Sequence, residues 1–280
     1  MARASKNKEA AIGSQNRTVS PNEAKSALTH CIKLQRPIMM WGAPGIGKSD
    51  IVKQIADAEG REVIDIRLPL WEPTDIKGIP YYNAKENNMV WASPAELPTD
   101  PKSNAIVFLD ELNSAAPAVQ AAAYQLILNR RVGQYHLPEG VSIVAAGNRD
   151  SDKGVTYRMP APLANRFVHV ELRVDFEDWM EWATNQHIHA DVVGYCTFAK
   201  QDLYDFDPRG SSRSFATPRS WSFVSQLLSD DLPESTLTDL VAGCVGEGLA
   251  VKFMNHRKIS GQLPNPSDIL SGKVRDLKTK

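Results

Sequence analysis

The 280-residue sequence contains only three cysteines and no long apolar run. Cys31, Cys196 and Cys244 are far apart and form no C-x-x-C pair, so we expect buried free thiols in a reducing cytoplasm. No stretch approaches the ~18 apolar residues of a membrane-spanning helix, and no apolar signal-peptide segment follows the N-terminus. The sequence therefore predicts a cytoplasmic protein that is neither exported nor inserted in a membrane.

A large excess of charge of one sign is also missing. The formal net charge is -1 at pH 7, which argues against a surface built entirely to bind nucleic acid. The exception is the N-terminus, where the only acidic residue among four basic ones is Glu9. The basic residues are Arg3, Lys6, Lys8 and Arg17. We interpret residues 1–19 as a disordered basic leader, with a phosphate-contacting arm as the alternative.

The folded part is expected to begin at residue 20. Ser20 is a typical helix N-cap, Pro21 suits the first helical position, and Glu23 completes a capping box. Apolar strand-like segments then alternate with helical or irregular ones. The expected strands are 37–41, 62–68, 105–110, 141–148 and 167–172, with a helix over 48–59 that Gly60 ends. This alternation predicts a parallel sheet covered by helices over residues 20–173.

Strand signals cease after Arg173, and helical periodicity replaces them. Capped helices are expected from 175 and from 217, with a loop over 207–216 and a third helix over 236–254. Residues 174–258 should therefore form a small all-α domain. Residues 259–280, which contain two prolines and scattered lysines, should form an extended tail.

The segment GAPGIGKS, residues 42–49, fits the phosphate-loop pattern G-x-x-x-x-G-K-[ST] between a strand and a helix. Its glycines let backbone N–H groups face phosphate oxygens, and the helix N-terminus adds partial positive charge. Lys48 would reach the β- and γ-phosphates, and Ser49 would bind Mg²⁺. The alternative is a glycine-rich turn without function. The expected nucleotide-binding residues are Gly42, Ala43, Pro44, Gly45, Ile46, Gly47, Lys48, Ser49 and Asp110.

The strand AIVFLD ends in Asp110 and is followed by Glu111. The two carboxylates should lie at the sheet edge where the phosphate loop opens. Asp110 would join Ser49 in holding Mg²⁺, and Glu111 would orient the attacking water or accept its proton. Capping of the next helix is the alternative reading of this acidic pair.

Three further polar residues could act on the same ligand. Asn148 follows another apolar strand, and its amide can donate to the γ-phosphate while it accepts from the water. Arg166 precedes the last strand and could supply transition-state charge to a neighbouring subunit, although a solvated arginine is the alternative and Arg158 is a second candidate. Arg219 lies in the first turn of a helix, where a cation is unfavourable unless an anion such as phosphate compensates it.

The order of these motifs resembles the AAA+ ATPases, and more narrowly the MoxR-like group with its CbbQ and NorQ relatives, over about residues 20–260. The resemblance implies an α/β fold, a P-loop AAA+ αβα sandwich with a parallel sheet, followed by a small all-α lid domain. It makes Asn148 sensor 1, Arg166 the arginine finger and Arg219 sensor 2, acting in cis or in trans. It also implies Mg²⁺-dependent hydrolysis of ATP between core and lid, at the interface of a homo-oligomeric ring that is most often a hexamer.

Two segments sharpen the resemblance. Residues 70–98 contain the pattern D-x-x-G at Asp75–Gly78, which in the helix-2-insert AAA+ group introduces a hairpin, and residues 132–143 resemble the hairpin before sensor 1. In the family both hairpins face the centre of the ring. The aromatic and histidine candidates for partner contact, with packing as the alternative, are Tyr81, Tyr82, Trp91, Tyr135 and His136.

The resemblance favours an ATPase that remodels a protein partner, since such proteins typically act as chaperones on metalloenzymes or with a von Willebrand factor A-type partner. The alternatives are a nucleic-acid motor and a nucleotide-gated scaffold that does no mechanical work. A metal site at His187, His189 and Asp191 is disfavoured, because the two histidines would face different sides of a helix. In the strand 167–172, His169 is expected to be a solvated edge residue.

Overall fold

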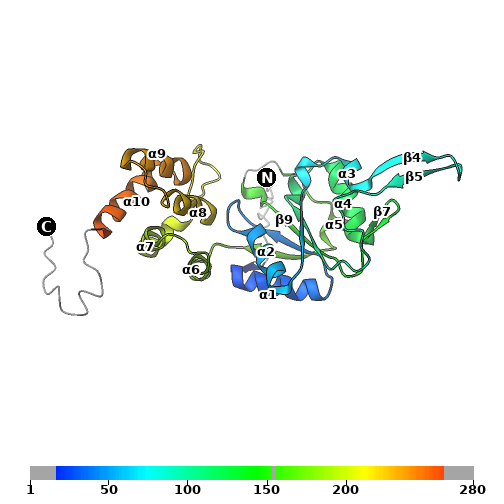
Figure 1. The fold of residues 1–280 in the computed structure, drawn as a ribbon, viewed down its shortest axis with the longest axis horizontal. Helices are drawn as coiled ribbons and strands as arrows, with labels where there is room; N and C mark the ends of the chain where they lie inside the picture. Colours follow the sequence, from blue (N-terminus) through cyan, green and yellow to red (C-terminus); the bar gives the residue numbers. More distant parts are fainter. Residues whose placement is uncertain (1–16, 153–155, 262–280) are drawn as a thin grey trace, which may run out of the picture. The chain divides into compact units, whose positions relative to one another are not determined.

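The computed structural model describes residues 17–152 and 156–261. These residues form two compact units: one ends at Arg173, and the other begins at Val174 and also takes in Gly45–Gly47. In Figure 1 the first unit runs from blue to green and the second from green to red. The expected leader, up to residue 16, and the expected tail, from residue 262, lie outside the described residues.

The first unit is built on a six-stranded sheet in which every adjacent pair is parallel. Its strands, in spatial order, are β1 (Thr18–Val19), β10 (Val168–Leu172), β2 (Ile38–Trp41), β9 (Ser142–Gly147), β6 (Ile106–Asp110) and β3 (Val63–Arg67). Because the strands are parallel, their carboxyl ends meet at one edge of the sheet. The predicted α/β fold class, with a parallel sheet and a helical second unit, is confirmed.

Helices cover both faces of this sheet (Figure 1). On one side lie α1 (Pro21–Lys33) and α2 (Lys48–Glu59), and on the other α4 (Pro117–Asn129). The expected capping box of α1 is present, with Ser20 accepting from the Glu23 N–H. Alternate strand residues such as Val107 and Leu109 pack with α4, because successive side chains of a strand point to opposite faces.

Two antiparallel hairpins interrupt the alternation, as the resemblance implied. The first follows η1 (Leu68–Leu70) and α3 (Pro73–Lys77) and pairs β4 (Ile79–Asn83) with β5 (Asn88–Ala92). The second pairs β7 (Arg131–Val132) with β8 (Tyr135–His136). Figure 1 shows the first hairpin extending away from the sheet. The short helices of this unit are η2 (Leu112–Ser114), η3 (Asp150–Asp152) and α5 (Ala161–Ala164).

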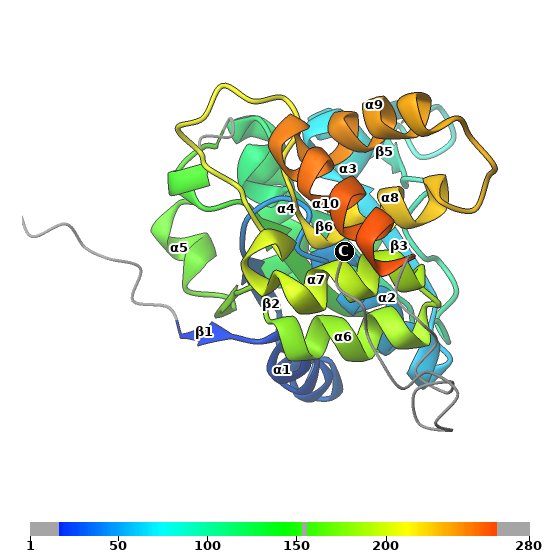
Figure 2. The same ribbon diagram turned by 90° about the vertical axis from the view of Figure 1, so that its left-hand side faces the viewer.

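The second unit contains five α-helices and one short 3₁₀ helix among its described residues. They are α6 (Phe176–Asn185), α7 (Ala190–Phe198), η4 (Lys200–Leu203), α8 (Pro218–Leu227), α9 (Glu234–Val245) and α10 (Glu247–Ser260), and the helices are labelled in Figure 2. Tyr195, Trp221 and Phe253 are fully buried at its centre with ring centroids 5.4–5.6 Å apart. Burial of three large aromatic side chains provides much of the stability of so small a helical unit.

Four sequence-based expectations need correction. Thr18–Val19 is not part of a disordered leader, because it pairs with β10 as an edge strand too short to carry a periodic signal. The helix expected over 236–254 is two helices, since Gly246 adopts φ +93° and interrupts it. The last helix continues to Ser260, past the expected end of the lid at 258. The helix α7 was not predicted.

The expectation for His169 is a fifth that needs correction. It lies on β10 between β1 and β2, so it is not on a sheet edge, and it is half-buried with both ring nitrogens in hydrogen bonds. A neighbouring polar residue of that strand, Glu171, is buried as well. The alternation was read correctly, but the polar face of the strand is covered by other parts of the unit.

No helix within residues 17–152 and 156–261 is long and apolar enough to span a membrane. Cys31 and Cys196 are buried and Cys244 is half-buried, and all three are free thiols.

Candidate functional site

The phosphate loop lies between β2 and α2, at the carboxyl edge of the sheet. Gly45 and Gly47 have φ values of +76° and +92°, which residues with a Cβ rarely adopt. The Gly42 N–H donates to the Gly147 carbonyl at 3.2 Å, which ties the start of the loop to the end of β9. These contacts hold the loop against the strand that precedes Asn148.

Lys48 is the first residue of α2 and is buried. Its Nζ donates to the carbonyl oxygens of Gly42 at 2.7 Å and Ala43 at 2.9 Å, and to Asn148 Oδ1 at 3.2 Å. Its ammonium group is therefore held inside the curve of the loop. Two predicted site residues that are a hundred positions apart in sequence are in direct contact.

Ser49 and Asp110 also meet at this edge, as predicted. The Ser49 hydroxyl donates to Asp110 Oδ2 at 3.4 Å, and Asp110 is 9% exposed. Burial, followed by the negative charge of Asp110, raises the pKa of Asp65 on the adjacent strand above its usual value. A hydroxyl and a carboxylate are oxygen ligands suited to Mg²⁺, which commonly binds one or two carboxylates together with substrate phosphates. The donor set at Ser49 and Asp110 fits that ion.

Glu111 directly follows Asp110 and has the left-handed conformation φ 55°, ψ 36°. This conformation is costly for a residue with a side chain, and such strain is often found at functional sites. Its N–H donates to Asp110 Oδ1 at 2.9 Å, while its side chain is exposed and makes no capping hydrogen bond to η2. The alternative of a simple helix cap therefore does not hold for Glu111.

Asn113 is a residue of this edge that sequence reasoning missed. It is 1% exposed, its Nδ2 donates to the Asn148 carbonyl at 2.8 Å, and its Oδ1 accepts from the Asn148 N–H at 3.1 Å. A Cβ on Gly147 would lie 2.5 Å from Asn113 Oδ1, so a glycine is required there. The available signal was the spacing DELN, in which an asparagine follows the acidic pair by two residues.

A second missed group fixes the segment after Asn148. Arg149 forms ion pairs with Asp152 at 2.9 Å and with Glu171 at 3.3 Å. Both carboxylates are buried, so the pairs are shielded from solvent and position Arg149 more firmly than surface pairs would. The residues on either side of Asn148 are therefore both fixed: Gly147 by the Gly42 N–H, and Arg149 by its two ion pairs.

Arg166 lies at the opposite edge of the sheet from Lys48. It precedes β10, and the Val168 N–H donates to the carbonyl of Pro37, which precedes β2. Its exposed side chain lines a recess of about 200 Å³ at the amino ends of the strands. The other lining residues are Gln35, Arg36, Pro37, Ile127, Leu128, Arg130 and Ile143. The structure therefore does not bring Arg166 to the phosphate loop of its own chain.

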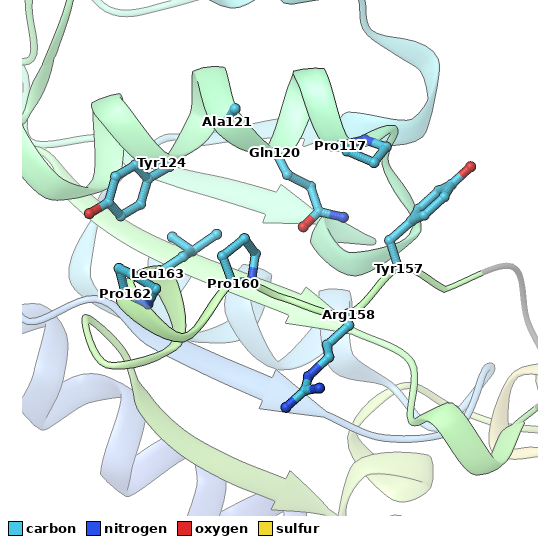
Figure 3. A pocket seen from close by; sticks show the side chains of 9 residues that line it. All are labelled: Pro117, Gln120, Ala121, Tyr124, Tyr157, Arg158, Pro160, Pro162 and Leu163. Atoms are coloured by element: carbon cyan, nitrogen blue, oxygen red, sulfur yellow. The ribbon is translucent and has the colours of Figure 1, made fainter.

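Arg158, the second arginine candidate, is also exposed and lines a mainly apolar pocket of about 230 Å³ (Figure 3). One wall of this pocket comes from α4 and the other from residues 157–163. The lining residues are Pro117, Gln120, Ala121, Tyr124, Tyr157, Arg158, Pro160, Pro162 and Leu163. Arg158 and Arg166 thus line different hollows of the same unit.

Arg219 lies in the first turn of α8, where Thr217 is the N-cap and Pro218 the first residue. Its side chain is exposed, and its backbone N–H donates at 3.1 Å to the carbonyl of Gly45, which groups with the second unit. The histidines of the disfavoured metal site do not lie on a helix. His189 caps α7 by accepting from the Asp191 N–H, and His187 has φ 54°.

The hairpin residues differ in their exposure. Tyr81 and Tyr82 are more than half exposed, His136 is exposed and Trp91 is half-buried. Tyr135 is 5% exposed, and its hydroxyl donates to the Pro98 carbonyl at 2.7 Å. Burial raises the pKa of Tyr135 to about 12. The packing alternative therefore holds for Tyr135, and the other four residues remain candidates for partner contact.

Comparisons with known proteins agree with this geometry. Residues 37–167 match the family model of the AAA domain, dynein-related subfamily. Midasin from Giardia intestinalis is 28% identical over 186 residues, which cover 63% of this chain but only 4% of that protein. The matched part of the chain contains the phosphate loop, the acidic pair, Asn148 and Arg166, and it supports an AAA+ ATPase domain.

Among solved structures, a candidate ATPase from Cytophaga hutchinsonii is 17% identical with a TM-score of 0.46, over 93% of this chain and 92% of that one. RuvB from Thermotoga maritima is 18% identical with a TM-score of 0.46, over 83% of this chain and 68% of that one.

Proposed function

We propose that this chain, with its AAA+ domain over residues 37–167, hydrolyses ATP to ADP and phosphate as a Mg²⁺-dependent, ring-forming ATPase. The observation that carries the proposal is the convergence of Lys48, Ser49, Asp110 and Asn148 at one sheet edge, with Glu111 beside them. These side chains come from the ends of two strands, β6 and β9, and from the start of α2, and the phosphate loop closes the same edge.

Each residue has a role that its contacts support. The loop N–H groups and Lys48 would hold the β- and γ-phosphates, and Lys48 is already oriented inside the loop. Ser49 and Asp110 would hold Mg²⁺, which supplies neutralisation of phosphate charge when it is bound. Glu111 would orient the attacking water and accept its proton. Asn148, fixed by Asn113, would align the water with the γ-phosphate.

The ring is inferred from the arginine. Arg166 lies at the amino edge of the sheet, away from its own phosphate loop, so the nucleotide that it would serve belongs to another chain. A homo-oligomer follows, and the MoxR-like resemblance favours a hexamer. In such a ring Arg166 would supply positive charge in trans at the phosphate that is being transferred. Arg219 remains the proposed sensor 2, in cis or in trans.

For the biological role we propose remodelling of a protein partner, with a von Willebrand factor A-type protein as one candidate, in the cytoplasm. The exposed Tyr81 and Tyr82 on the β4–β5 hairpin are suited to contact such a partner. The matched part of the chain covers only 4% of its Midasin relative, so the activity of that whole protein is not transferred to this chain. A salt-sensitive, several-fold stimulation of the ATPase by added DNA would instead favour a nucleic-acid motor.

Two substitutions test the assignment of the site. Lys48→Ala should abolish nucleotide binding, because it removes the cation held in the loop. Glu111→Gln should bind ATP normally and hydrolyse it at least ~10²-fold more slowly, because an amide cannot accept the proton. Binding is measured with a fluorescent ATP analogue, and hydrolysis as phosphate release. Normal turnover by Glu111→Gln would show that the base is a different residue.

A further inference from the structure

His169 is hydrogen-bonded to the last residue of β2 and to the last residue of α5. Trp41 Nε1 is 2.9 Å from His169 Nδ1, and His169 Nε2 is 2.7 Å from the Ala164 carbonyl oxygen. An indole N–H can only donate and a carbonyl can only accept, so Nδ1 must be the acceptor and Nε2 must carry the proton. The imidazole is therefore neutral, in a single tautomer, with both nitrogens in use.

The Trp41 end of this arrangement reaches the phosphate loop. Trp41 is the last residue of β2 and is followed directly by Gly42, whose carbonyl accepts from Lys48 Nζ at 2.7 Å. The indole also stacks on the imidazole, with ring centroids 6.0 Å apart and planes inclined by 15°. Trp41 therefore connects the start of the phosphate loop to His169 by chain continuity, a hydrogen bond and ring stacking.

The Ala164 end reaches the turn that carries Arg166. The Ala164 carbonyl also accepts from the Phe167 N–H at 3.2 Å, which closes a turn around Asn165 and Arg166. The buried ring of Phe167 lies edge-on to the imidazole, with centroids 6.1 Å apart. His169 therefore contacts this turn at two points, the Ala164 carbonyl and the ring of Phe167.

The strand register shows that this contact path crosses the sheet. His169 pairs with Met39, and Glu171 pairs with Trp41, so Trp41 and His169 lie on the same face two positions apart. Trp41 is at the carboxyl edge, whereas Arg166 precedes the amino end of β10. The path from Gly42 through Trp41, His169 and Ala164 thus joins the two edges.

We propose that His169 is a positioning residue that couples the phosphate loop of a subunit to the arginine which that subunit offers to its neighbour. The inference rests on the proposed ring ATPase with Arg166 acting in trans. Nucleotide in one subunit would set the position of Arg166 and so the rate in the next subunit. Successive sites would then communicate through the core of each subunit as well as through the interface.

The test uses mixed rings in which the two sides of the interface come from different variants. Arg166→Ala subunits keep an intact nucleotide site and lack the finger, whereas Glu111→Gln subunits cannot hydrolyse ATP and offer a finger. Each variant alone should be nearly inactive, and the mixture should regain activity. His169→Phe is then added to one partner or to the other.

His169→Phe in the Glu111→Gln partner should lower the kcat of the mixture roughly 10- to 100-fold with the KM for ATP unchanged, because a misplacement of about 1 Å has this effect. The same change in the Arg166→Ala partner should leave the kcat of the mixture within about twofold of its value without the change, because that partner supplies no arginine to its neighbour. His169→Gln, which can still donate to Ala164, should restore most of the activity in the first position. Equal losses in both positions would indicate a purely structural residue and overturn the inference.

Coupling to the loop is tested with Trp41→Phe, which removes the donor to Nδ1 and leaves the Ala164 contact. A finger-donating subunit that cannot bind nucleotide, Lys48→Ala, should activate its neighbour less than a Glu111→Gln donor does. Trp41→Phe in both donors should abolish that difference, and a difference that persisted would overturn the coupling. Failure of the Arg166→Ala and Glu111→Gln mixture to regain any activity, in rings of normal mass, would instead overturn the proposed trans arginine and this inference with it.

Discussion

At the scale of single residues, Asn113 connects the segment after β6 to the segment after β9. The proposed chemistry needs these two segments in a fixed relative position. It makes two hydrogen bonds to the backbone of Asn148 from a position that is almost fully buried. It is not expected to touch the nucleotide itself. Its effect on the rate should therefore come entirely through the position of Asn148.

Asn113→Asp keeps the shape of the side chain and the acceptor for the Asn148 N–H. It replaces the donor Nδ2 with an oxygen facing the Asn148 carbonyl, and it buries a charge. We expect a loss of about 1–3 kcal/mol in stability and a roughly tenfold lower kcat, with ATP affinity little changed. Denaturant unfolding, phosphate release and nucleotide titration measure the three quantities. Asn255→Asp, on the exposed side of α10, is the matched control and should be neutral; equal effects of the two changes would contradict the role of Asn113.

Much of this edge is predictable from sequence because each residue sits in a local pattern. Lys48, Ser49, Asp110 and Asn148 follow apolar strands or glycines, and a parallel sheet brings such positions to one edge. Asn113, whose only local signal is the DELN spacing, and Glu171, one partner of Arg149, do not follow a strand end in this way. Their contacts are made across 22 to 35 residues of chain, and only the folded arrangement identifies them.

At the scale of elements, Gly246 decides where the long C-terminal helical segment divides. It has φ +93° and ψ 151°, a region that is essentially restricted to glycine, and it joins α9 to α10. A Cβ there would also lie 3.4 Å from the Ser214 carbonyl oxygen. The sequence predicted one helix over 236–254, because helical periodicity continues through Gly246. The break is set by the backbone conformation of Gly246, which periodicity does not encode.

Gly246→Ala should therefore lower the free energy of unfolding of the second unit by about 1–3 kcal/mol. Gly243→Ala is the matched control. It lies within α9, its added Cβ meets no atom within 4 Å, and alanine should stabilise the helix by about 0.5–1 kcal/mol. Thermal unfolding followed by circular dichroism compares the two variants. A shift of the same sign for both would mean that the break at Gly246 is not enforced by backbone conformation.

At the scale of the whole molecule, the sequence predicts the layers better than the ends of the fold. The parallel sheet and its covering helices follow from long apolar segments, whereas β1 is two residues long and gains its partner only from β10. The same limit applies to assembly. The sequence makes Arg166 either a finger for a neighbouring subunit or a solvated arginine, and only the fold shows that it lies at the amino edge of the sheet, away from its own phosphate loop.

If Arg166 acts in trans as proposed, ATP hydrolysis should depend on assembly. The specific activity of the wild-type protein should rise with protein concentration, in parallel with the mass measured by light scattering. Arg166→Ala should assemble similarly. Its specific activity should stay about 10³-fold or more below that of the wild type at every concentration, since the transition-state charge is missing. Arg158→Ala, in the neighbouring apolar pocket, is the matched control and should retain the concentration dependence. Constant specific activity in a protein of monomeric mass would rule out a trans arginine, whereas loss of activity in Arg158→Ala alone would transfer the role to that residue.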